Sequence, residues 1–309
     1  MRKLSVLLLT ILLLNLCLGA YAGAEGNLAA PFASGSGEAA MASRIAEILG
    51  TDTIPADDAL PESERRINAA NLMLADPGTL LCDTQAALIA ALQGYTAEDF
   101  RSAMTPVCRA ARCPLYLVMG KNTAAEMGID GAESFLGWLA EHEYDDTCLL
   151  ARHVEASPLD RAAVFLSEEL PLLTDVFFPE QIPELIRSGE AALAVFTASE
   201  LEAASQDLLI LFTLGGERTE AHPEVPSITE SGFRACPEPA LYLMAKSGTE
   251  EAFLQECALK ISEADLSAVC SSAGYVFDPA SGEALQAEIA GIFADYKDYM
   301  TAEGLYFYE

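Results

Sequence analysis

Basic residues are scarce in this sequence. Its 309 residues include 17 lysines and arginines against 47 aspartates and glutamates, which gives a formal net charge of −30 at pH 7. Such an acidic chain repels nucleic acid and anionic lipid surfaces, so neither is an expected partner. Apolar residues are not scarce, because 51% of the chain is hydrophobic. That share excludes the disordered class and is enough to build a core.

Motifs for catalysis and for metal binding are also missing. The three histidines, His142, His153 and His222, form no HExxH pair of the kind that binds zinc. The sequence contains no GxSxG elbow, no phosphate-binding GxxxxGK[ST] loop and no EF-hand spacing. We therefore expect no enzyme activity, no metal and no cofactor, and a secreted hydrolase is the least favoured function.

Long apolar runs are confined to the first 24 residues. There, two basic residues precede the run Leu4–Leu18, and Ala20-Tyr21-Ala22 fits the small-x-small pattern of a signal peptidase site. The alternatives are a lipid anchor at Cys17 and an uncleaved anchor, which would need about 20 apolar residues. We expect residues 1–24 to be a cleaved signal peptide. The mature chain is then exported to the periplasm or beyond, with no direct membrane insertion.

Seven cysteines follow the leader, and export permits disulfides. An odd number leaves at least one thiol unpaired within the chain. We expect Cys257–Cys270 to be the first bridge and Cys108–Cys113 the second. For Cys82 and Cys148, buried apolar thiols are the alternative. The seven are Cys82, Cys108, Cys113, Cys148, Cys236, Cys257 and Cys270.

Strands and helices alternate along the mature chain, which predicts α/β lobes built on mostly parallel sheets with helices on their faces. A length of about 285 residues suggests two domains. The pattern restarts at Gly120, and a return strand is predicted at Ala240–Ala245. We therefore expect one lobe from residues 25–119 together with 236–309, and a second lobe from residues 120–235.

The most distinctive stretch is residues 209–233. An apolar run, Leu208–Leu214, is broken by Gly215-Gly216, and a proline-rich loop leads to a short helix closed by glycine. This order resembles a hallmark of the substrate-binding receptors of tripartite tricarboxylate transporters, the Bug family. The residues that carry the resemblance are Arg218, Pro223, Val225, Pro226, Ser227, Glu230 and Gly232.

The resemblance covers nearly all of residues 27–300. It implies a two-lobed fold of the periplasmic-binding-protein type (type II) with a ligand cleft between the lobes. It also implies a function: capture of a small, carboxylate-bearing organic ligand outside the membrane for the subunits of such a transporter. The alternative is a degenerate receptor fold that acts as a sensor or protein-interaction module.

The expected binding residues lie where strands end. A Gly/Ser turn before the helix at residues 38–49 can cradle an anion with free N–H groups. By resemblance, it would hold the ligand carboxylate together with a second turn at residues 152–157. There Arg152 could fork onto a carboxylate, the alternative being a solvated or internally salt-bridged turn. The full set is Ser34, Gly35, Ser36, Gly37, Glu38, Asp83, Thr84, Gln85, Arg152, His153, Ser157 and Thr197.

Overall fold

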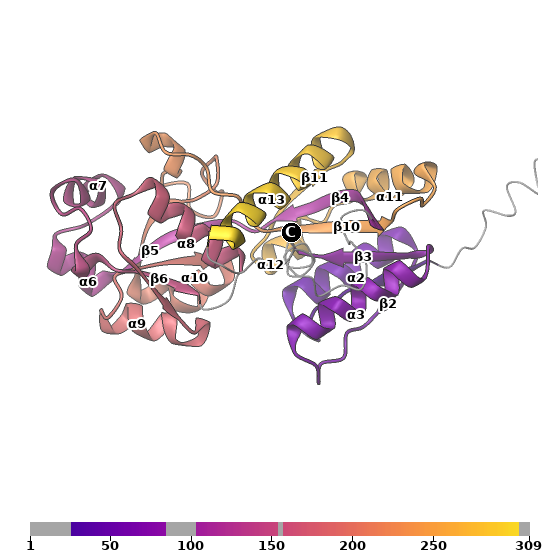
Figure 1. Cartoon of the computed structure of the whole chain (residues 1–309), viewed down its shortest axis with the longest axis horizontal. Helices are drawn as coiled ribbons and strands as arrows, with labels where there is room; N and C mark the ends of the chain where they lie inside the picture. The colour runs from indigo at the N-terminus through magenta and orange to yellow at the C-terminus, as the bar shows by residue number, and fades with distance from the viewer. Residues whose placement is uncertain (1–25, 85–102, 154–156, 303–309) are drawn as a thin grey trace, which may run out of the picture.

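The computed structural model describes residues 26–84, 103–153 and 157–302. The expected signal peptide, Gln85 and the helix expected at residues 86–92 lie outside the described residues. Two β-sheets, each flanked by helices, form two lobes that lie side by side along the long axis (Figure 1). The two-lobed α/β fold expected from the sequence is confirmed.

The first lobe is built on a six-stranded sheet in the order β11-β4-β10-β3-β1-β2. Strand β1 pairs in parallel with β2 and β3, whereas β10 runs antiparallel to β3 and β4, and β11 antiparallel to β4. Its strands are β1 (Asn27–Ala29), β2 (Asp52–Ile54), β3 (Thr79–Asp83), β4 (Met104–Arg112), β10 (Ala240–Lys246) and β11 (Val276–Ala280).

The second lobe is built on a five-stranded sheet in the order β7-β6-β8-β5-β9. Strand β6 is parallel to β7 and β8, and β5 is antiparallel to β8 and β9. Both sheets are thus mixed rather than mostly parallel as expected, because the strands next to the crossings between the lobes reverse direction. The strands are β5 (Leu115–Gly120), β6 (Leu150–His153), β7 (Thr174–Phe177), β8 (Leu193–Thr197) and β9 (Leu208–Thr213).

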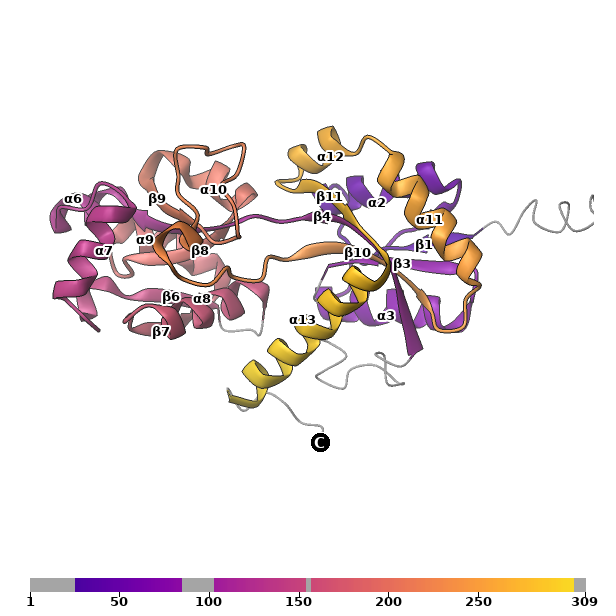
Figure 2. The same cartoon turned by 90° about the horizontal axis from the view of Figure 1, so that it is seen from above.

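Two chain segments connect the lobes. The first joins the end of β4, at Arg112, to the start of β5, at Leu115, and the second leads from the loop after β9 into β10 at Ala240 (Figure 2). Because β5 pairs inside the second sheet, the chain changes sheet before residue 115 rather than at the expected boundary after residue 119.

Helices cover both faces of each sheet, and several buried clusters fill the space between them. The helices of the first lobe are α2 (Gly37–Leu49), α3 (Glu62–Ala75), α11 (Glu251–Glu263), α12 (Ser267–Ser272) and α13 (Gly282–Ala302). Those of the second lobe are α6 (Lys121–Met127), α7 (Ala132–Glu141), α8 (Pro158–Glu169), α9 (Ile182–Ser188) and α10 (Ala198–Ala204).

Helix α13 is a third connection between the lobes. Leu285 and Ile289, in its first turns, pack in the core of the first lobe. Near its end, Asp295 accepts hydrogen bonds from Arg161 of α8 at 2.9 and 2.6 Å. The hydroxyl of Tyr299 donates to Asp160 of the same helix. The C-terminal turns of α13 thus dock onto the second lobe.

The disulfide expectation is wrong. In the part of the chain that the structure describes, all seven cysteines are free and buried. Cys108 lies within β4 and Cys113 directly after it, and five residues of extended chain span about 16 Å, too far for a bridge. Burial raises the pKa of Cys257 and of Cys270 to about 11, so both thiols stay protonated.

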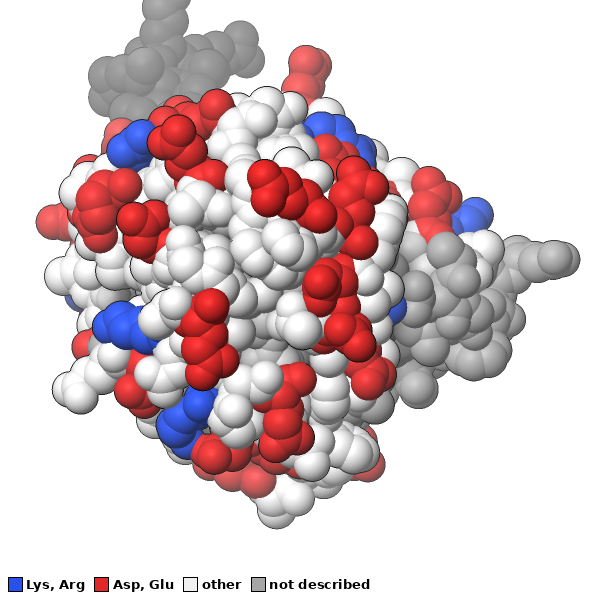
Figure 3. Space-filling model, turned by 90° about the vertical axis from the view of Figure 1, so that its left-hand side faces the viewer, with Lys and Arg blue, Asp and Glu red and all other residues white. Residues whose placement is uncertain are grey.

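Acidic residues outnumber basic ones on the face of the second lobe that Figure 3 shows. On the end of the second lobe, acidic side chains are scattered over the whole face with few basic ones between them (Figure 3). The surface seen in Figure 3 therefore offers no basic patch that would attract nucleic acid.

No helix among the described residues is both long and apolar enough to cross a bilayer.

Candidate functional site

A cavity of about 450 Å³ lies between the lobes. The chain reaches it where β1 and β3 end in the first lobe and where β6 and β8 end in the second. Of the residues expected from the sequence, the cavity brings together Ser36, Glu38, Thr84, His153, Ser157 and Thr197. We call this cavity the cleft.

The Gly/Ser turn builds one wall of the cleft. Ser36 caps α2, since its hydroxyl accepts a hydrogen bond from the N–H of Ala39 at 3.1 Å. The turn needs glycine twice: Gly35 has φ +82°, and a Cβ on Gly37 would lie 2.6 Å from that of Ala273. The backbone N–H of Ser34 donates a hydrogen bond to Asp58. Of the five expected turn residues, Ser36 and Glu38 line the cleft.

Ser34, Gly35 and Gly37 do not line the cleft. The first two line a separate surface hollow behind the turn, and Gly37 packs against α12. Their role is to shape the turn so that the next residues face the other lobe. The sequence could not separate these roles, because it does not show which way a turn points.

The second turn forms the opposite wall. Ser157 caps α8, its hydroxyl accepting from the N–H of Asp160 at 3.1 Å, and His153 is 8% exposed at the end of β6. Arg152 is not a free fork for a ligand carboxylate. Its Nε and Nη2 bind the two oxygens of Asp160 at 3.0 and 3.1 Å. The internally salt-bridged turn, the alternative expected from the sequence, is the arrangement observed.

Asp83 is buried behind the cleft rather than in it. It forms an ion pair with Arg66, whose Nε and Nη2 also bind Glu62 at 3.1 and 2.5 Å. Burial raises the pKa of Asp83 even though the guanidinium beside it opposes that shift. The next residue, Thr84, lines the cleft and accepts from Arg66 at 3.2 Å.

Several polar residues of the cleft are not among those expected from the sequence, and they include Arg65, Glu200 and Tyr275. Arg65 donates to the carbonyl oxygens of Pro31 at 3.1 Å and Leu60 at 3.2 Å. Among the described residues, no carboxylate lies within 4.0 Å of its guanidinium. A site search restricted to strand ends misses Arg65, since it projects from the first turn of α3.

Glu200 and Tyr275 come from opposite lobes. Glu200 lies in the first turn of α10, and one of its oxygens accepts from both the N–H and the hydroxyl of Thr197 at 2.8 Å. The hydroxyl of Tyr275 donates to Glu38 at 3.4 Å. Burial, together with the nearby carboxylate, raises the pKa of Tyr275, so the phenol stays protonated as a donor.

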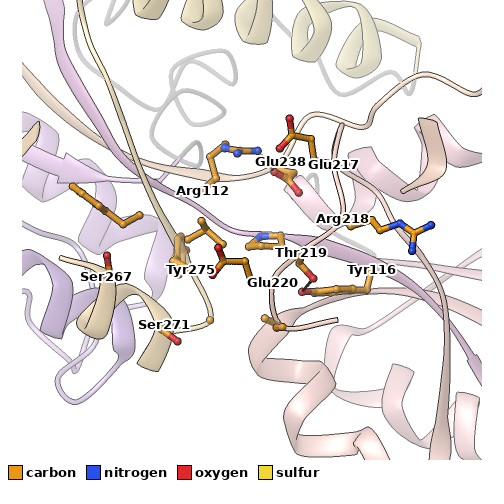
Figure 4. Close-up of a pocket in the computed structure, with 17 residues that line it drawn as sticks. Arg112, Tyr116, Glu217, Arg218, Thr219, Glu220, Glu238, Ser267, Ser271 and Tyr275 are labelled. Atoms are coloured by element: carbon orange, nitrogen blue, oxygen red, sulfur yellow. Dashed lines mark hydrogen bonds and ion pairs between the residues drawn. The ribbon is translucent and has the colours of Figure 1, made fainter. Parts of the chain in front are cut away.

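A second cavity, of about 500 Å³, lies on the other side of the connecting segments. Figure 4 shows Ser267 and Ser271 on α12 facing Tyr116 and Thr219 of the second lobe across it. We call it the rear cavity. Alternate residues of the connecting segments face the two cavities: Arg112, Pro114 and Glu238 line the rear cavity, and Cys113 and Pro239 line the cleft.

Two lobes joined by paired crossing segments, with strand ends facing a cleft, define a two-lobed fold of the periplasmic-binding-protein type. No family model and no curated protein matches the chain. Solved structures do. A TctC solute-binding protein from Polaromonas superposes with a TM-score of 0.75 at 16% identity, over 91% of this chain and 99% of that one.

Two similar structures from Rhodopseudomonas palustris contain ligands. MatC with bound malate has a TM-score of 0.61 at 16% identity, over 88% of this chain and 97% of that one. A second protein, with adipate, has a TM-score of 0.62 at 15% identity, over 92% and 98%. The periplasmic binding protein BugD is also similar, with a TM-score of 0.60 at 15% identity, over 91% of this chain and 98% of that one. The expected likeness to Bug-family receptors is confirmed in the fold, at the low identity of a divergent sequence.

Proposed function

We propose that this chain is an extracytoplasmic receptor that captures a small carboxylate-bearing solute in the cleft and passes it to a tripartite tricarboxylate-type transporter. One observation carries the proposal: the capped N-termini of α2 and α8, from different lobes, open into the same cavity at Ser36 and Ser157. Free N–H groups and the helix dipole make each terminus favourable for an anion.

The size of the cleft fits a small metabolite. Its volume of about 450 Å³ lies within the range of roughly 300–1,000 Å³ typical of ligand pockets. Malate in MatC and adipate in the second Rhodopseudomonas protein support a carboxylate of about four to six carbons as the ligand class. The connecting segments beside the cleft are in the right place for a hinge that closes the lobes over the ligand.

Titration calorimetry tests the proposal. The expected result is one binding site per chain for at least one organic acid in a panel of mono- and dicarboxylates, with and without amino groups. Pro179→Trp, which places a bulky ring at an exposed position on the cleft wall, should abolish this binding. Glu180→Trp, at the exposed neighbour that does not line the cleft, should bind like the parent. If Pro179→Trp and Glu180→Trp bind the ligand equally well, the cleft is not the binding site.

A second candidate is a receptor fold that no longer binds solute and serves as a sensor or interaction module. One observation favours it: the carboxylate of Glu38 lines the cleft in the first turn of α2, where an anionic ligand would otherwise lie. The same titrations decide between the two functions. Binding of any solute that Pro179→Trp removes supports the receptor, and no binding across the panel supports the second candidate.

A further inference from the structure

The cleft carries fixed charges of both signs. The carboxylate of Glu38 comes from the first lobe and that of Glu200 from the second, and both line the same cavity. Both also act on the thiol of Cys113, whose pKa is raised first by burial and then by surrounding carboxylates that include these two. The two acidic groups therefore face a common small volume across the gap between the lobes.

Each carboxylate has a structural role that uses only part of its hydrogen-bonding capacity. In Glu200, Oε2 accepts both bonds from Thr197, and in Glu38, Oε1 accepts from Tyr275. Among the described residues, neither forms an ion pair with a lysine or arginine within 4.0 Å. As the lobes approach, two like charges in a partly dry cleft repel each other. A cation held between them removes this repulsion.

The cleft also has a positive group that is already held in position. Two backbone carbonyls hold the guanidinium of Arg65, one from Pro31 beside the Gly/Ser turn and one from Leu60. Arg66, its neighbour, is occupied by Glu62 and Asp83. Of these two arginines, Arg65 is therefore the one that can bind a ligand carboxylate, and a planar guanidinium suits that task.

We propose that the solute is zwitterionic, with its carboxylate on Arg65 and its ammonium group between Glu38 and Glu200. The inference rests on the proposed receptor function and specifies its ligand. A dicarboxylate would place its second negative group against two carboxylates. In an amino acid or an ω-amino acid, the carboxylate meets the guanidinium of Arg65 and the ammonium group meets the two carboxylates. Because those carboxylates come from different lobes, the ammonium group links the lobes.

Probes that differ only in their end groups test the inference. For chains of four, five and six carbons, calorimetry compares the dicarboxylate, the ω-amino acid and the diamine. The five-carbon set is glutarate, 5-aminovalerate and cadaverine, and glutamate and lysine extend the panel to α-amino acids. The expected result is binding of at least one aminocarboxylate at least tenfold tighter than the dicarboxylate and the diamine of the same length.

Charge-removing variants identify the partner groups. Glu38→Gln should weaken the aminocarboxylate at least tenfold and tighten the matched dicarboxylate, since it removes one repulsive charge. Arg65→Gln should weaken both of these probes. The controls are Glu47→Gln and Arg44→Gln, which alter exposed residues on the outer part of α2 and should leave every affinity unchanged. Thermal unfolding of each variant checks that it is folded.

Each alternative outcome overturns the inference. If the dicarboxylate binds more tightly than the aminocarboxylate, the inference is wrong and the receptor function stands. A Glu38→Gln variant that weakens all probes equally shows a structural role only, which also contradicts the inference. Binding of none of the probes overturns the inference and the carboxylate-receptor function together.

Discussion

Arg218 and Glu230 form a two-point ion pair, with both guanidinium–carboxylate contacts at 2.7 Å. Arg218 also donates to the carbonyl of Pro223, and Glu230 accepts from the N–H of Ser227 at 2.9 Å. The residues that carry the Bug-family likeness thus tie their own loop together. This loop lines the rear cavity and not the cleft, so the motif is most informative about the fold.

Strong acid should loosen this loop. The hydrogen bond from Arg218 lowers the pKa of Glu230 from 4.5 to about 2. A lowered carboxylate pKa means that the stabilisation is complete above about pH 4.5 and is lost as the pH falls through about 2. The protection of amides at residues 215–232, measured as the exchange rate relative to the intrinsic rate at each pH, should fall over that range. In Glu230→Gln protection should be low throughout, and Glu224→Gln should behave like the parent. If the protection of this loop in the parent protein does not change with pH, the Arg218–Glu230 pair does not stabilise the loop.

The contact of α13 with the second lobe should stabilise the molecule. Asp295→Asn removes the charge that binds the largely buried Arg161, and we expect a loss of about 1–2 kcal/mol in the free energy of unfolding. Asp298→Asn, on the exposed side of the same helix, should cost almost nothing. Urea titrations measure both. If the two variants are equally stable, the ion pair does not hold the lobes together.

The buried pair behind the cleft should be far more sensitive. Arg66→Gln leaves Asp83, which is fully buried, without its counter-charge, and we expect a loss of about 3–5 kcal/mol. The double variant with Asp83→Asn should recover part of that loss, because no uncompensated charge remains. Chemical denaturation of the set measures the coupling. Additive losses would mean that the two side chains do not interact.

The rear cavity should report on hinge closure from a distance. Since it lies across the connecting segments from the cleft, rotation that closes one cavity opens the other. Ser271→Trp should wedge the rear cavity open, favour the closed cleft and tighten solute binding by about fivefold. Ser272→Trp, exposed on the same helix, is the matched control. Weaker binding by Ser271→Trp alone would contradict the opposed arrangement.

Much of the fold could be predicted from the sequence, because buried strands leave clear apolar runs. Leu115–Gly120 and Leu208–Thr213 are examples. Strand β4, Met104–Arg112, was missed. It contains a proline and two arginines, and its pairing with β10 shifts register twice, so it shows no clean alternation.

The site could be predicted only in part. Ser36 could be predicted because a Gly/Ser turn directly before a helix is visible in the sequence, and Ser157 because the second turn resembles that of the Bug family; the structure shows both as helix caps. The pairing of Arg152 with Asp160, eight residues away, and the place of Arg65 in the cleft depend on how the elements pack. The local spacing of residues in the sequence does not indicate such contacts.

The most direct test of the receptor account is a crystal structure of the mature protein purified from its native host without added ligand. The account predicts density for one small organic molecule in the cleft, between Ser36 and Ser157, with a carboxylate at Arg65. An empty cleft, or a molecule found in the rear cavity instead, would contradict it.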